Sequence, residues 1–130
     1  MWYKLDGDSI VKIKAEELPI VEKSRRDRRL NTNVSIKNPH ITVAVSTVFL
    51  SVDHSFRDGD APVLFETMVF VKSDIELDPD EYLAQDEIQI RYETIQGARK
   101  GHKRIVEHIT NELTKKELGR VKVDNIKLSL

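Results

Sequence analysis

The strongest constraint on the fold is an apolar run between Ile41 and Leu50. Its residues on one face are Ile41, Val43, Val45, Thr47 and Phe49, and further apolar residues lie on the other face. A two-residue period is that of a β-strand, and apolar groups on both faces predict a central strand covered at least partly on both sides. Pro62 precedes a second apolar run, 63–71. The two runs therefore predict an antiparallel hairpin whose connecting loop is polar.

The chain before this hairpin predicts three further elements. Residues 2–13 read as a small hairpin that turns at an Asp-Gly pair. A first helix follows from about Ala15, started late or broken at Pro19, because proline is tolerated only in the first turn of a helix. It ends in the arginine-rich stretch 25–29, where cations complement the helix dipole. A short strand is predicted over 31–36.

The chain after the hairpin begins with an acidic excursion, 74–87, that contains seven acids and no base. An edge strand is predicted over 88–92, and a final extended segment or edge strand over 121–128. Between them Thr94 caps a second helix that runs to about Leu118. The apolar stripe of this helix, spaced three and four apart, is Ile95, Ala98, His102, Ile105, Ile109 and Leu113.

Together these elements predict one α+β domain over residues 1–130, an antiparallel sheet of four to six strands with two helices packed on one face. The chain has no cysteine, which excludes disulfides, thiolate metal sites and cysteine nucleophiles. Its 21 basic and 22 acidic residues provide no general attraction to nucleic acid or to an anionic membrane. No apolar run is long enough to span a membrane and no signal-peptide core is present, so we expect a soluble, cytoplasmic protein.

Three motifs mark the centre of the chain: V-S-T-V-F-L-x-x-D-H-x-F over 45–56, L-F-E-T-M-V-F over 64–70, and R-Y-x-T over 91–94 with G-H at 101–102. This pattern resembles a family of small phage and prophage proteins. The resemblance implies origin rather than chemistry: a phage-derived accessory protein in the cytoplasm of an infected or lysogenic bacterial host. The family usually has glycine where Ser51 stands.

One group of residues with chemical potential is Asp53, His54, Glu66 and His102. Glu66 lies between apolar residues in its strand, where a carboxylate is costly unless it is paired. His102 interrupts the apolar stripe of the second helix, and the adjacent Gly101 permits close approach to the sheet. If the second helix packs on the face that carries Glu66, His102 and Glu66 would form an imidazole–carboxylate pair. Three interpretations of such a pair are open: a structural ion pair, a polar cluster that orients a ligand, or part of a divalent-metal or acid–base site. The spacing matches no metal signature, which favours the first two interpretations.

A second group is basic and contains Arg25, Arg26, Arg28 and Arg29 together with Arg99, Lys100, Lys103 and Arg104. Two arginine forks near one loop would suit a phosphate or a nucleotide. Ordinary solvated helix faces are the alternative interpretation. No aromatic residues interleave with the basic runs, which argues against nucleic-acid binding. The candidate ligand-binding residues are Arg25, Arg28, Arg29, Asp53, His54, Phe56, Glu66, Arg91 and His102.

The sequence therefore predicts a protein that acts by binding, with no catalytic residues, metal or cofactor assigned. The leading hypothesis is counter-defence, in which the protein sequesters a small phosphorylated, nucleotide-like ligand or masks a host protein. The first alternative is a metal-assisted hydrolase that uses Asp53, His54, Glu66 and His102. The second is an interaction module that pairs through an edge strand or through the acidic segment. Edge strands at both ends of the sheet lead us to expect a homodimer.

Overall fold

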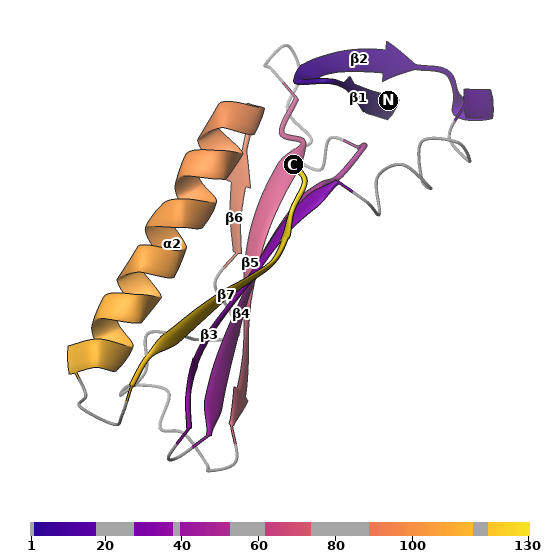
Figure 1. Cartoon of the computed structure of the whole chain (residues 1–130). Coiled ribbons are helices and arrows are strands. Elements are labelled where there is room, and N and C mark those ends of the chain that lie inside the picture. The colour runs from indigo at the N-terminus through magenta and orange to yellow at the C-terminus, as the bar shows by residue number, and fades with distance from the viewer. Residues whose placement is uncertain (1, 18–27, 38–39, 53–61, 74–88, 116–119) are drawn as a thin grey trace.

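The computed structural model describes residues 2–17, 28–37, 40–52, 62–73, 89–115 and 120–130. Within these ranges, a five-stranded antiparallel sheet has the strand order β6-β5-β4-β3-β7, and a separate β1–β2 hairpin stands at one end of it (Figure 1). The elements in chain order are β1 (Trp2–Asp6), β2 (Ser9–Ile13), the 3-10 helix η1 (Ala15–Glu17), β3 (Arg29–Ile36), β4 (Ile41–Phe49), β5 (Phe65–Ser73), β6 (Gln89–Tyr92), α2 (Ile95–Lys115) and β7 (Lys122–Leu128).

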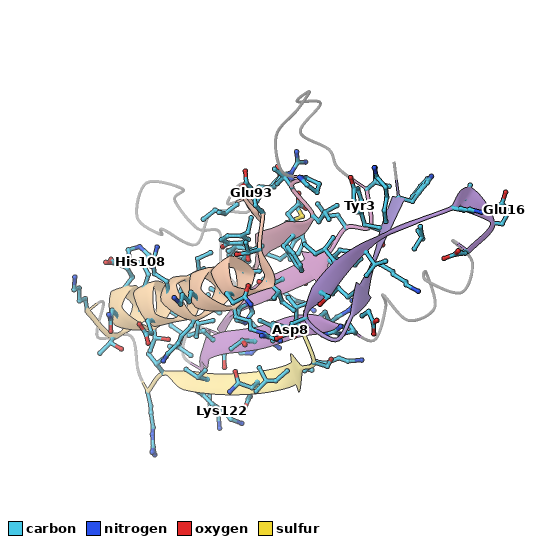
Figure 2. All side chains as sticks on the ribbon, turned by 90° about the horizontal axis from the view of Figure 1, so that it is seen from above. Tyr3, Asp8, Glu16, Glu93, His108 and Lys122 are labelled. Atoms are coloured by element: carbon cyan, nitrogen blue, oxygen red, sulfur yellow. The ribbon has the colours of Figure 1, made fainter. Side chains whose placement is uncertain are left out.

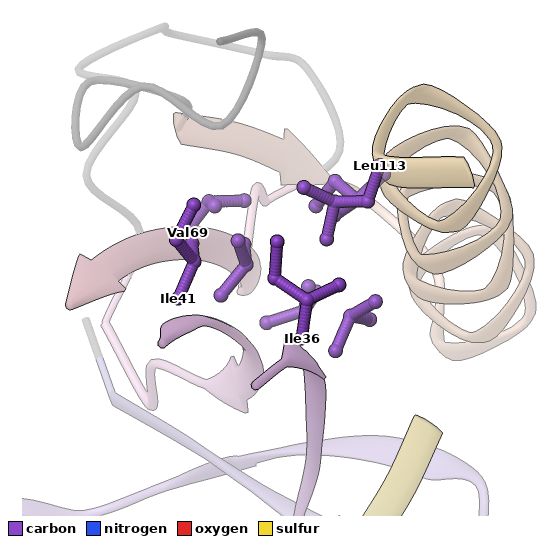
Figure 3. Close-up of a cluster of buried hydrophobic side chains, with 8 residues drawn as sticks. Ile36, Ile41, Val69 and Leu113 are labelled. Atoms are coloured by element: carbon purple, nitrogen blue, oxygen red, sulfur yellow. The ribbon is translucent and has the colours of Figure 1, made fainter. Parts of the chain in front are cut away.

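Helix α2 covers one face of the sheet, where it contacts β3, β4, β5 and β6 (Figure 1). Every second residue of β3 and β4 is buried, as the period of a strand with one covered face requires. The main apolar core lies between the helix and these strands (Figure 3). Its buried members are Val34, Ile36, Ile41, Val43, Val45, Val69, Ile109 and Leu113.

A second apolar cluster joins the β1–β2 hairpin to the end of the sheet. Tyr3, Leu5 and Ile10 of the hairpin pack against Leu30, Phe49, Leu64, Phe65, Ile95, Ala98 and Leu130. At the hairpin turn, the Arg99 guanidinium donates to both carboxylate oxygens of Asp8, at 2.9 and 2.8 Å. Arg28 Nη1 donates to the Gly7 carbonyl oxygen at 2.6 Å. Figure 2 shows Asp8 where the hairpin approaches the first turns of α2.

The start of α2 follows from its local sequence. Thr94 Oγ1 accepts a hydrogen bond from the Gly97 backbone N–H at 3.0 Å, which confirms the predicted N-cap. The absence of a side chain at Gly101 lets the helix lie directly on Tyr92 of β6, because a Cβ at this position would overlap the tyrosine ring. Close approach of the helix to the sheet at Gly101, predicted from the sequence, is therefore confirmed.

Among the described residues the structure confirms an α+β fold with an antiparallel sheet of five strands, in which β6 and β7 are the edge strands. Two helices on one face are not confirmed, since α2 is the one α-helix among the described residues. Most of the predicted first helix falls on 18–27, outside the described residues, as does the acidic excursion 74–87. The helix was predicted to extend through Arg29, which is wrong: Arg29 already pairs with Val48 in the sheet. No described helix is long and apolar enough to cross a membrane.

Candidate ligand-binding site

His102 lies in the buried stripe of α2 and is hydrogen-bonded through both ring nitrogens to the sheet below. Its Nδ1 is 2.7 Å from Thr47 Oγ1 on β4, and its Nε2 is 2.8 Å from Thr32 Oγ1 on β3. The residue is 5% exposed. The imidazole therefore connects the helix to two adjacent strands and leaves neither nitrogen without a partner.

The hydrogen bonds around His102 form one directed chain across the sheet. Thr32 donates its only hydroxyl proton to Asn125 Oδ1 at 3.0 Å, so its oxygen must accept from His102 Nε2–H. A neutral imidazole with a proton on Nε2 has Nδ1 as an acceptor, and Nδ1 then accepts a hydrogen bond from the Thr47 hydroxyl. Thr67, 2.6 Å from Thr47, donates to the Thr47 oxygen. Each hydroxyl in the chain thus donates once.

Burial lowers the pKa of His102 from 6.5 to about 4. The cause is desolvation, because a charged imidazolium loses more hydration free energy in the interior than a neutral imidazole does. The ring is accordingly neutral at physiological pH, in agreement with the directed hydrogen-bond chain.

A groove of about 740 Å³ lies beside His102, between α2 and β7; we call it the α2–β7 groove. On the helix its lining extends from Arg99 to Asn111, which at 1.5 Å per residue is about 18 Å. Its aliphatic lining residues are Leu30, Val106, Val123, Leu128 and Leu130. The groove exists because α2 lies over the centre of the sheet and leaves the edge strand β7 uncovered.

Polar groups lie at two places along the α2–β7 groove. Thr32, His102 and Asn125, members of the directed chain, line it from the sheet and the helix. Lys103 and Glu107 line it from successive turns of α2, and both are exposed. An apolar groove with a few placed polar groups has the composition of a site for a small molecule.

A bulge in β7 brings Asn125 and the leucines to the same groove. Thr32 pairs with Asn125, but the preceding β3 residue, Asn31, pairs with Lys127, so Ile126 is an extra residue on β7. One extra residue reverses the alternation of side chains beyond it. Leu128 therefore faces α2, as Asn125 does, instead of the opposite side of the sheet.

Glu66 lies on the face of the sheet that α2 does not cover. Its neighbour Thr67 points to the helix, so Glu66 points away from it. Glu66 is 7% exposed, and its Oε2 accepts hydrogen bonds from Gln89 Nε2 at 2.7 Å and from Arg91 Nε at 2.9 Å. The expected pairing of Glu66 with His102 is not formed, because the two side chains are on opposite faces. They therefore cannot ligate one metal ion.

Three of the predicted residues fall in one row across this open face. Cross-strand pairing runs from Arg29 through Val48 and Glu66 to Arg91. Strands are about 4.8 Å apart, so the two arginine backbones are separated by about 14 Å. Arg29 Nε is buried and has no hydrogen-bond partner within the described structure. The row thus combines one ion pair with one arginine whose Nε is unsatisfied.

The other predicted residues are elsewhere or cannot be placed. Arg28 binds the Gly7 carbonyl oxygen of the β1–β2 hairpin and lies 4.0 Å from the Asp8 carboxylate, so its guanidinium stabilises the hairpin. Arg25, Asp53, His54 and Phe56 lie outside the described residues.

The residues that sequence reasoning missed are the threonines and the lining of the α2–β7 groove apart from Arg99, His102 and Lys103. A signal was present in three strands: a single threonine stands in each apolar stripe, at Thr32, Thr47 and Thr67. Three hydroxyls on the face that meets the helix stripe containing His102 indicate a buried polar network. Asn125 had no such signal, because its contact with Thr32 depends on the pairing of β7 with β3, two segments far apart in the sequence.

Comparison of the chain with models of protein families, with curated proteins and with solved structures finds no match.

Proposed function

We propose that this protein acts by binding a small amphipathic acid in the α2–β7 groove. The observation that carries this proposal is a concave site of about 740 Å³ with aliphatic walls and a few fixed polar groups. Sites for small molecules typically have volumes of about 300–1,000 Å³ and this kind of lining. As in the hypothesis from the sequence, the protein acts by binding, but the ligand now lies on the helix-covered side of the sheet instead of at the predicted hairpin loop.

The lining of the groove indicates the chemistry of its ligand. Lys103 has no ion-pair partner among the described residues, whereas Arg99 is already paired with Asp8. Glu107, one turn further along α2, repels an anion, so the acid group of the ligand lies at the Lys103 end. The lining side chains include no phenylalanine, tyrosine or tryptophan on which a base could stack, and the lining histidine, His102, is held through both ring nitrogens by threonines. An aliphatic body with a phosphate or carboxylate therefore fits better than a nucleotide.

The state of His102 supports binding rather than acid–base catalysis. Both ring nitrogens are engaged by threonine hydroxyls, and burial depresses the pKa well below neutrality. A general acid or base needs a nitrogen within reach of the substrate and a pKa near the working pH. The role we assign to His102 is to hold Thr32, and through it Asn125, in a fixed orientation at the groove.

The test compares two neighbouring charge reversals on α2. Lys103 lines the groove, and the adjacent Arg104 is also exposed but does not. Isothermal titration calorimetry is carried out with dodecanoate, dodecyl phosphate and adenosine monophosphate as probes. We expect the dodecyl acids to bind, Lys103→Glu to weaken them by about tenfold or more, and Arg104→Glu to leave their affinity unchanged. Equal effects of the two variants, or no binding of either dodecyl acid, would overturn the proposal.

A second candidate is a phosphorylated ligand on the open face of the sheet. It is favoured by Arg91, whose Nε is held by Glu66 so that the terminal nitrogens of the guanidinium are oriented as a fork. Phe70, exposed on the same face, is four residues from Glu66, or about 13 Å along the strand. This candidate predicts that adenosine monophosphate binds, that Arg91→Ala abolishes its binding, and that Lys103→Glu does not. Failure of adenosine monophosphate to bind would contradict it.

The biological setting of the proposal rests on the motif resemblance. A phage-derived accessory protein in the cytoplasm of a bacterial host would use such a site to sequester a small signal, or would mask a host protein through its surface. Native mass spectrometry of protein purified gently from a bacterial host tests this directly. A bound acid of a few hundred daltons, lost on denaturation, would support sequestration, and a protein without added mass would favour masking.

A further inference from the structure

The outer edge of β7 is the most exposed apolar part of the sheet. Within the described structure β7 pairs with β3 alone, so the backbone groups of its other edge have no strand partner. Val123 is 43% exposed, Ile126 63% and Leu128 64%. Figure 2 shows β7, with Lys122, at the margin of the sheet. An exposed edge with unpaired backbone groups is a template for another strand.

We infer that β7 pairs with β7 of a second copy, antiparallel, about a two-fold axis that passes between the two copies of Val123. The inference goes beyond ligand binding and does not depend on it. Pairing in this way extends the sheet in its own plane to ten strands, so the α2–β7 groove of each copy stays on the helix side.

The pleat of the strand limits the registers that are available. A two-fold axis perpendicular to the sheet keeps each residue on its own face, and directly opposed residues in an antiparallel pair share a face. Val123 and Asn125 are on the helix face, whereas Lys122 and Asp124 are on the open face, as their β3 partners show. The axis must therefore pass between two copies of the same residue. The bulge at Ile126 confines regular pairing to the part of β7 before it.

Charge selects one register among those that remain. An axis at Lys122 would bring two ammonium groups together, and an axis at Asp124 would bring two carboxylates together. With the axis at Val123, each Lys122 lies opposite Asp124 of the other copy. Lys122 Nζ and Asp124 Oδ2 are already 3.5 Å apart within one chain, so the four charges alternate in sign around the axis. The two Val123 side chains then meet on the helix face and exclude water from each other.

The experiment is a charge swap that uses this symmetry. In the variant Lys122→Glu, the new glutamate of each copy lies opposite Asp124 of the other copy, so two pairs of like charges form in each dimer. In the variant Asp124→Lys, the new lysine of each copy lies opposite Lys122 of the other copy, with the same result. Sedimentation velocity over a wide range of concentration is expected to show a wild-type dimer. Each single variant should raise the dimer dissociation constant by at least about tenfold, since like charges directly opposite are destabilising. The double variant Lys122→Glu/Asp124→Lys should restore dimerisation.

The matched control is Lys127→Glu, which reverses a charge on the same face of the same strand but beyond the bulge. It should leave the dissociation constant unchanged, and circular dichroism should show that every variant keeps the wild-type melting profile. A wild-type monomer at all concentrations would overturn the inference. A dimer that is insensitive to the single reversals, or one that the double variant fails to restore, would equally overturn it.

Discussion

As the pH is lowered, this protein should lose stability at a higher pH than protonation of its carboxylates alone would cause, because His102 is buried in its neutral form. In the unfolded chain the pKa of His102 is near its ordinary value of 6.5, and in the folded protein burial lowers it to about 4. Between these values the unfolded state binds a proton that the folded state does not. Stability therefore rises with pH across this window, and it is lost as the pH falls from 6.5 towards 4.

The size of the effect follows from the shift in pKa. Each unit of pH within the window corresponds to about 1.4 kcal/mol of unfolding free energy. We expect a loss of about 2 kcal/mol between pH 6.5 and about pH 5, and of about 3 kcal/mol by about pH 4. A domain of this size typically has a total stability of roughly 5–15 kcal/mol, so the loss is readily measured.

The assay compares the wild-type protein with His102→Gln in urea unfolding at a series of pH values. Glutamine is neutral at every pH, and its amide supplies one donor and one acceptor to the threonines. The other three histidines and all carboxylates are present in both proteins. The difference between the two pH profiles therefore isolates His102. The wild-type profile should fall relative to that of His102→Gln between pH 6.5 and about pH 5.

Nuclear magnetic resonance gives an independent readout of the same group. The His102 ring should remain neutral at about pH 5, and its nitrogen shifts should report the proton on Nε2, as the directed hydrogen-bond chain requires. Parallel pH profiles for the two proteins would refute the reasoning, as would a titration midpoint near 6.5. Either result would mean that water reaches the imidazole in the folded state.

Three further changes test how the elements are held together. Gly101→Ala should lower the melting temperature, with a net loss of about 1–2 kcal/mol, because the new methyl group overlaps the Tyr92 ring and the gain in helix propensity only partly compensates; a melting temperature that rises would contradict the packing. Ser51→Gly should stabilise the fold by about 1 kcal/mol in urea unfolding, since Ser51 has a φ of 65° and its buried hydroxyl has no partner within the described structure. Arg99→Lys should lower the melting temperature slightly, and added salt should shrink the difference, because lysine cannot reproduce the paired hydrogen bonds to the exposed Asp8.

The alternation of apolar residues predicted the central strands correctly, because the residues that alternate in the sequence are the ones that are buried in the structure. Every second residue of β4 is apolar or Thr47, and those residues are the buried ones. The N-cap at Thr94 and the close approach at Gly101 were also readable, since each depends on residues near in sequence. The end of the first helix was predicted too late in the chain. A run of arginines is compatible both with the last turn of a helix and with the start of a strand, so it did not reveal that β3 begins at Arg29.

The candidate site was less predictable, because charged side chains find partners across the fold. Arg28 and Arg91 were expected to bind a ligand, and in the structure Arg28 holds the hairpin while Arg91 is paired with Glu66. Local pattern placed Glu66 in an apolar stripe with Leu64 and Met68. In the structure Glu66 and Met68 lie on the open face, whereas Leu64 precedes β5 and is buried in the second apolar cluster. No feature of one strand states which of its faces a helix will cover.

The sequence by itself determined the classes of element, most of their bounds and the buried stripe of α2, because these follow from short-range periods of two and about 3.6 residues. Only the tertiary structure decided what His102 binds, which requires the register of β3, β4 and β5 under the helix. It also decided the α2–β7 groove, since one extra residue at Ile126 turns Leu128 towards α2. The bulge is defined only by the pairing of β7 with the distant strand β3, and a shift of one residue moves every later side chain to the other face.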